Sequence, residues 1–141
     1  MLAVSVSLAA ATSIGRAADA PRLRLFDITT EIGMPHLEEN LRYATTRVEQ
    51  CLTDEQLFHR FPVLDHVALR DCRLAPEIQQ SEAAIYRLVC SGGHGTTGDA
   101  VWRIGEHSLR GTLTVKLGGK NMTFYQRVTA TPLGDCAADA D

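Results

Sequence analysis

The chain has 141 residues, of which 45% are hydrophobic and 22% are charged, and its formal net charge is −3. A chain of this length suits one domain, and this ordinary composition argues against an intrinsically disordered protein. The slight negative charge argues against nucleic-acid binding, which depends on a clustered basic surface. We therefore expect a single globular domain with no nucleic-acid partner.

The first twenty residues predict a cleaved signal peptide. Residues 2–14 are apolar or small apart from Ser and Thr, and Ala17, Ala18 and Ala20 follow with the spacing of a signal-peptidase site. The apolar run is shorter than the about 20 residues that span a bilayer, so no transmembrane span is expected in the mature chain. No Lys or Arg precedes the run, so a retained anchor and a simple N-terminal extension remain alternatives. We predict a signal peptide at 1–20, one β domain at 21–136, a frayed tail at 137–141 and a periplasmic location.

The four cysteines agree with export. Their number is even, none belongs to a C-x-x-C motif, and all lie in the expected mature region: Cys51, Cys72, Cys90 and Cys136. The missing C-x-x-C argues against a zinc ribbon or a thioredoxin-type redox site. In an oxidising compartment such cysteines ordinarily form structural bridges, so we expect two disulfides.

The first half of the mature chain predicts a strand pair and then a short helix. Residues 22–32 and 41–51 read as strands joined by a loop at 33–40. Thr53 and Gln56 then form a capping box, in which each residue's side chain bonds the other's backbone N–H at a helix start. We expect a helix of about eight residues that ends before Pro62 and lies on the sheet.

The next segment predicts a β-hairpin that brings two cysteines together. Residues 67–78 and 83–90 flank 79–82, and a turn about Ser81 places Cys72 opposite Cys90 and Leu74 opposite Leu88. Both pairs fall on one face of the hairpin. This register assigns the disulfide Cys72–Cys90, which leaves Cys51–Cys136 by elimination.

Two further hairpins complete the chain. Residues 100–104 and the stretch from 109 onward flank a turn at 105–108, and 112–117 and 122–131 flank a two-residue loop at 119–120. That loop places apolar residues opposite one another, Leu117 with Met122 and Val115 with Phe124. The predicted fold is mainly β: an antiparallel meander forming a curved sheet or small barrel, with one short helix and two disulfides. Its expected core includes Leu74, Leu88, Leu113, Val115 and Phe124.

The whole pattern resembles a family of bacterial secreted proteins designated domain of unknown function 3617. The matching segments run in order along nearly all of the mature chain: Phe26–Thr30, Cys51–Gln56, Asp71–Arg73, Tyr86–Gly92, Gly111–Val115 and Leu133–Cys136. The cysteine with its helix cap and the closing Gly-Asp-Cys are the most specific of these.

The chain departs from that family at two places. It carries Gly33-Met-Pro-His36 where a first loop rich in Gly and Met is common, and Leu23-Arg-Leu-Phe26 where the family has Gly-Leu-Trp. The family has no established activity, so the resemblance implies export and the fold and nothing about chemistry.

Neither the glycine-rich motif nor the histidines predict a cofactor or metal site. Gly93–Gly98 matches G-x-G-x-x-G, but a strand pattern follows it where dinucleotide binding needs a helix start. The histidines lack metal-ligand spacing, and the best local cluster, His36 near Glu38 and Glu39, is equally well explained as a solvated loop; the five are His36, His59, His66, His94 and His107. We therefore predict no cofactor, no metal and no catalytic residue.

Three functional hypotheses follow. The first is a non-enzymatic protein-interaction module or accessory subunit of an envelope complex. The second is a binding protein for a small apolar or amphipathic ligand, and an enzyme is the least supported. An interior cavity would favour a ligand, an exposed apolar patch a protein partner, and a cleft with paired ionisable groups an enzyme. The large aromatic residues are expected in the core, or otherwise at a ligand or protein contact: Tyr43, Tyr86, Trp102 and Tyr125.

Overall fold

The computed structural model of this protein describes residues 21–33, 43–92, 94–119 and 122–136. The predicted signal peptide at 1–20, most of the predicted first loop and the predicted tail at 137–141 lie outside the described residues.

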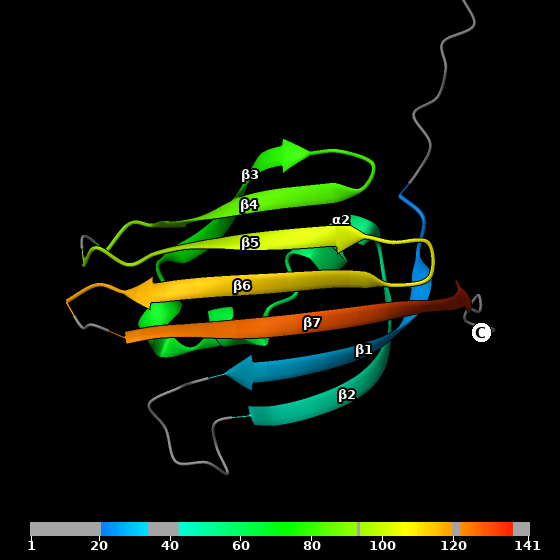
Figure 1. Ribbon diagram of the computed structural model, residues 1–141, viewed down its shortest axis with the longest axis horizontal. Helices are drawn as coiled ribbons and strands as arrows, with labels where there is room; N and C mark the ends of the chain where they lie inside the picture. Colours follow the sequence, from blue (N-terminus) through cyan, green and yellow to red (C-terminus); the bar gives the residue numbers. More distant parts are fainter. Residues whose placement is uncertain (1–20, 34–42, 93, 120–121, 137–141) are drawn as a thin grey trace, which may run out of the picture.

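One open antiparallel sheet contains all seven strands (Figure 1). The spatial order is β2-β1-β7-β6-β5-β4-β3, so the first and last strands of the chain pair with each other. Because β2 and β3 are separate edges, the chain forms a sheet and not the alternative small barrel. The strands are β1 (Arg24–Gly33), β2 (Tyr43–Leu52), β3 (Cys72–Gln79), β4 (Ala83–Cys90), β5 (Thr97–Ile104), β6 (Leu109–Leu117) and β7 (Met122–Asp135).

The segment between β2 and β3 covers one face of the sheet (Figure 1). It contains α2 (Asp54–Phe58) and two short 3-10 helices, η1 (Pro62–Asp65) and η2 (Val67–Leu69). The capping box is confirmed, since Gln56 N donates to Thr53 Oγ1 over 3.1 Å and Thr53 N donates to Gln56 Oε1 over 2.9 Å. The helix is shorter than predicted, with five residues, and it ends before Pro62 is reached.

The prediction that a strand begins near Val67 is wrong. Residues 67–69 form η2, and His66 stabilises its start by accepting a hydrogen bond from Ala68 N at Nδ1 over 3.1 Å. Pro62 begins η1, where its missing N–H leaves no hydrogen bond unmade. Strand β3 therefore begins only at Cys72.

The core lies between this segment and the inward face of the sheet. Alternate residues of the strands point into it, and Leu57, Phe61 and Leu69 meet them from the other side. The predicted core residues are all buried, with no side chain more than 7% exposed: Leu74, Leu88, Leu113, Val115 and Phe124. Trp102 is fully buried, and its Nε1 donates to the Phe58 carbonyl oxygen over 2.9 Å, which fixes α2 against β5.

The hairpin registers follow the predictions where the apolar alternation is clean. Cys72 lies opposite Cys90 and Leu74 opposite Leu88, and the disulfide Cys72–Cys90 is present. A bulge after Pro76 shifts the pairing, so that Ile78 lies opposite Ile85 and the register fails near the turn. Between β6 and β7, Leu117 faces Met122 and Val115 faces Phe124 as predicted. Gly118 and Gly119, the latter with φ +73°, begin the turn, whose Lys120 lies outside the described residues.

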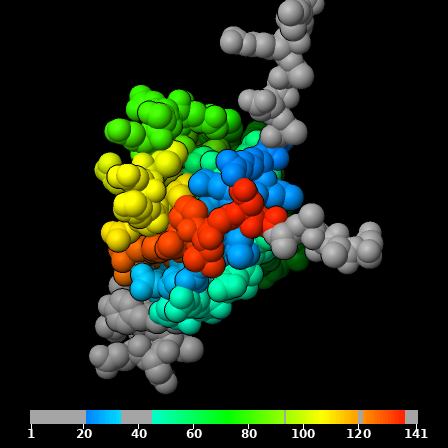
Figure 2. Space-filling model, turned by 90° about the vertical axis from the view of Figure 1, so that its right-hand side faces the viewer, coloured from blue at the N-terminus to red at the C-terminus, as the bar shows by residue number. Residues whose placement is uncertain are grey.

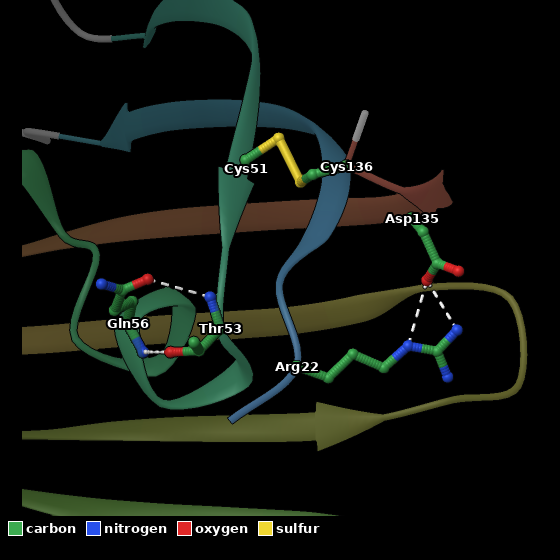
Figure 3. The surroundings of a disulfide bond; sticks show 6 residues. All are labelled: Arg22, Cys51, Thr53, Gln56, Asp135 and Cys136. Atoms are coloured by element: carbon green, nitrogen blue, oxygen red, sulfur yellow. Dashed lines mark hydrogen bonds and ion pairs between the residues drawn. A yellow bond between two sulfur atoms is a disulfide. The ribbon is translucent and has the colours of Figure 1, made fainter. Parts of the chain in front are cut away.

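The second disulfide, Cys51–Cys136, ties β2 to the chain after β7 (Figure 3). Strand β1 separates β2 from β7, and two strand spacings come to roughly 9.6 Å, yet the two Cα atoms lie 5.9 Å apart. The chain after Asp135 therefore turns across the start of β1 to reach Cys51. Figure 2 faces this end of the sheet, where the last strand adjoins the first. Since β7 is an interior strand, this bridge does not close the sheet.

Candidate interaction site

The glycine-rich motif runs into a strand, where dinucleotide binding needs a helix start. Its last residue, Gly98, is the second residue of β5, so a strand follows it as predicted. A Cβ at Gly98 would lie 2.4 Å from the Thr114 carbonyl oxygen, so the absence of a side chain there allows β6 to approach. Gly93 lies outside the described residues.

The described histidines form no metal-ligating cluster with one another or with acidic residues. His59 caps the end of α2 and packs its ring on Tyr86 with 4.8 Å between centroids, whereas His66 caps η2. In the described ranges, no three His, Cys, Asp or Glu side chains come together as a metal site would need. The cluster of His36, Glu38 and Glu39 that the sequence favoured lies outside those ranges.

The large aromatic residues divide between the two faces of the sheet. Trp102 and Tyr86 are buried in the core, where Phe58 and Phe61 contact Trp102 with centroid separations of 5.3 and 5.6 Å. Tyr125 lies on the outer face and covers Gly33, where an added Cβ would meet its ring. The Tyr43 side chain is outside the described part of the chain.

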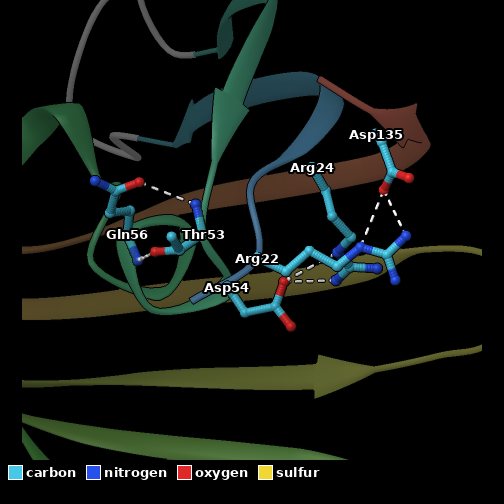
Figure 4. A network of polar contacts seen from close by, with 6 residues as sticks. All are labelled: Arg22, Arg24, Thr53, Asp54, Gln56 and Asp135. Carbon is cyan, nitrogen blue, oxygen red and sulfur yellow. Dashed lines mark hydrogen bonds and ion pairs between the residues drawn. The ribbon is translucent and has the colours of Figure 1, made fainter. Parts of the chain in front are cut away.

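A surface hollow of about 610 Å³ lies beside the start of α2 and is lined mainly by charged and polar residues. Figure 4 shows how its charges are arranged. Arg24 donates twice to Asp54 Oδ1, over 3.2 and 2.6 Å, and Arg22 donates twice to Asp135 Oδ1, over 3.0 and 2.6 Å. Both arginines are thus used in holding α2 and the end of β7 to the start of β1. These ion pairs thus link three segments of the chain, and neither arginine is left free for a ligand.

Shifted pKa values occur at side chains outside this hollow, and ion pairs or burial explain each shift. The Arg47 guanidinium donates to Asp27 and holds the pKa of that carboxyl below its usual range. Glu77 raises the pKa of Arg87 through an ion pair between β3 and β4, and burial raises the pKa of Tyr86. The three groups lie in surface ion pairs or in the core, so none of these shifts indicates an acid–base site in a cleft.

An apolar groove lies between the 3-10 helices and the end of the β6–β7 hairpin. Its volume is about 190 Å³, and His66 is its one polar lining residue. The apolar wall consists of Val63, Ala68, Leu69, Leu117, Met122 and Phe124. Met122 is 37% exposed, and Val67, next to the lining in sequence, is 64% exposed, so apolar surface continues beyond the groove.

The walls of this groove are fixed from below. Gln126, fully buried in β7, accepts a hydrogen bond from Val63 N at Oε1 over 3.0 Å, which ties η1 to the sheet. Leu69 anchors η2 with 1% exposure, and the paired residues Leu117 and Met122 form the opposite wall. A groove held in this way loses little conformational entropy when it is filled.

Sequence reasoning missed this site because it assigned two lining residues, Ala68 and Leu69, to a strand and predicted no element for Val63 and His66. Pro62 at a helix start and His66 two residues before Ala68 were the local signals for η1 and η2. Gln126 was visible in the alternation of Phe124, Val128 and Ala130, which predicts that it points into the core.

Comparisons with protein-family models, curated proteins and solved structures find no match to this chain. Among the described residues, no helix has the length and apolar character needed to cross a membrane. The structure itself defines a fold class: an open, disulfide-bonded antiparallel sheet that is covered on one face and has an apolar groove at one end.

Proposed function

We propose that the protein is a periplasmic interaction module that acts without catalysis, as a binder or an accessory subunit of an envelope complex. Its contact site is the apolar groove between η1, η2 and the β6–β7 hairpin. The observation that carries the proposal is the conjunction of a fixed apolar wall with exposed Met122 and Val67 around it. The occupant is one projecting apolar side chain, such as Leu, Met or Phe, from a protein partner.

The size of the groove favours a side chain over a free ligand. Pockets for small molecules typically measure about 300–1,000 Å³ and bury most of the ligand. This groove has about 190 Å³ and is open on one side, so it suits a single side chain whose backbone remains outside. Apolar groups that fill such a pocket are the usual anchors of protein interfaces.

A peptide titration followed by NMR tests the proposal. A short peptide with a central Leu should shift the backbone signals of Val63, Leu69 and Leu117, and the same peptide with Ala should not. Met122→Glu places a charge at the mouth of the groove and should abolish these shifts. Val89→Glu is the matched control, because Val89 has similar exposure, 38%, and lies on β4 outside the groove lining.

A parallel titration with decanoate separates the two binding hypotheses. Saturable shifts at the groove with decanoate alone would replace the protein partner by a small apolar ligand. If neither probe shifts the groove signals, or if Val89→Glu abolishes them as Met122→Glu does, the groove is not the contact site.

Export and family membership belong to the same proposal. The apolar leader and the small residues before Pro21 support a mature chain that begins between Ala18 and Pro21. N-terminal sequencing of protein from the periplasmic fraction should therefore begin in that range, and a sequence beginning at Met1 would contradict export by this route. Membership in domain of unknown function 3617 rests on the cysteine, cap and Gly-Asp-Cys segments, and it adds no activity.

A further inference from the structure

The two edges of the sheet differ in their readiness to accept another strand. Strand β3 has eight residues, contains Pro76, which lacks an N–H, and carries a bulge between Pro76 and Ile78. Proline and bulges are common means of blocking an edge. Strand β2 has ten residues, contains no proline and pairs in a regular register with β1 alone within the described part of the chain. Among the described residues, the stretch of β2 around Val48 is therefore the edge better suited to pairing.

The exposed sequence of β2 is complementary to itself. In an antiparallel pair of β2 strands centred on Val48, Arg47 of each copy lies opposite Glu49 of the other, and the two Val48 side chains adjoin. Arg47 has a side chain 73% exposed, Val48 is 43% exposed, and Glu49 is exposed without an ion pair to any described residue. Arg47 also donates to Asp27 of its own copy, and its guanidinium has further N–H groups for a second carboxylate. Opposite charges and paired apolar residues directly across a strand pair are each favourable.

The neighbouring registers lack this complementarity. A shift of two residues in one direction places Arg47 opposite Arg47, and a shift in the other places Glu49 opposite Glu49. Shifts by one residue would set the covered face of one sheet beside the outer face of the other. Of these registers, the one centred on Val48 alone pairs opposite charges and apolar residues and also keeps the 3-10 helices of both copies on one side of the joined sheet.

We infer that the protein forms a symmetric dimer through its β2 edges, which joins the two sheets into one continuous antiparallel sheet. The twofold axis passes beside Val48. Such a contact is isologous, since one surface patch on each copy meets the same patch on the other. It is independent of the apolar groove, which lies at the β6–β7 hairpin. The added interface is one strand wide, so the dimer is concentration-dependent.

Sedimentation equilibrium of the oxidised protein over a wide concentration range tests this inference. Dimers should form as concentration rises, and Val48→Lys should abolish them by placing two cations side by side. Ile78→Lys on β3 is the matched control, because Ile78 is 41% exposed on the opposite edge. It should leave association unchanged.

A charge exchange tests the register itself. Glu49→Arg faces Arg47 of the second copy and should weaken association by about tenfold or more. The double variant Arg47→Glu with Glu49→Arg should restore it, since opposite charges again meet across the two copies and the new arginine faces Asp27 on β1. Circular dichroism verifies that each variant folds. If a variant misfolds, its association measurement is replaced by a second test, in which Val48→Cys should form an intermolecular disulfide across the twofold axis. A monomer at all concentrations, or a dimer that Ile78→Lys disrupts and Val48→Lys does not, would overturn the inference.

Discussion

The two disulfides should differ in their contributions to stability because they close loops of very different length. Cys51–Cys136 spans 85 residues and Cys72–Cys90 spans 18. The loop-closure relation gives about 4.6 kcal/mol for the long bridge and about 3.2 kcal/mol for the short one. The expected difference, about 1.4 kcal/mol, corresponds to roughly a factor of ten in the unfolding equilibrium.

Single-bridge variants measure each contribution separately. Cys72→Ala with Cys90→Ala retains only the long bridge, and Cys51→Ala with Cys136→Ala retains only the short one. Urea unfolding of each variant, oxidised and then reduced, isolates one bridge while its cysteine side chains stay in place. This design matters because Cys72 and Cys90 pack against the core, so their replacement alone also removes apolar contacts.

The variant that retains the long bridge should lose more free energy of unfolding on reduction than the variant that retains the short one. The long bridge's crossing of β1 gives a second structural reason, since it holds the chain end over the first strand. An equal or greater loss on reduction of the short bridge would refute the loop-closure argument. It would indicate that the short bridge stabilises the protein mainly through contacts within the folded β3–β4 hairpin.

Three further predictions concern single side chains. In the folded state, burial raises the pKa of Tyr86 above its ordinary value of 10.0. The free energy of unfolding should therefore decline as the pH rises above about 10, because the unfolded chain loses this proton first. In Tyr86→Phe, the urea midpoint should decline less steeply over the same pH range. Arg103 and Arg110 lie directly opposite each other on the outer face; Arg110→Glu should raise the free energy of unfolding by about 0.2–1 kcal/mol, and a lower value would show that this pair is not repulsive. Thr53→Ala removes the side-chain acceptor of the helix cap and should cost about 1 kcal/mol in thermal or urea unfolding, whereas Thr53→Ser should retain most of it; equal losses in both variants would contradict the capping role.

Local patterns in the sequence predicted the hairpins well, because each register depends on residues close together in the chain. Leu117 with Met122, and Cys72 with Cys90, follow from alternation around a short turn. The bulge after Pro76 was not visible, since it requires one extra residue on one strand alone. The pairing of β1 with β7 joins segments about a hundred residues apart, and periodicity carries no information about such a contact.

The groove could not be predicted from periodicity for a related reason. Its walls come from η1, η2 and a distant hairpin, so its existence depends on how the covering segment packs on the sheet. The apolar residues from Val67 to Leu74 fit a strand about as well as a short helix, and a run of this length is ambiguous. The disulfides were predictable because the register of one hairpin brought Cys72 and Cys90 together, and the two remaining cysteines formed the second pair by elimination.

Gln126 links the core to the groove. It is fully buried, its Oε1 accepts from Val63 N, and its Nε2 has no hydrogen-bond partner among the described residues. Leucine at this position would avoid the unpaired amide but would leave Val63 N–H without its acceptor, and the two costs are of similar size. Stability alone therefore gives little reason for glutamine here. The amide adds direction: it sets η1 at one distance and angle from β7, and η1 forms one wall of the groove. The shape of the proposed contact site thus depends on a polar group inside the core.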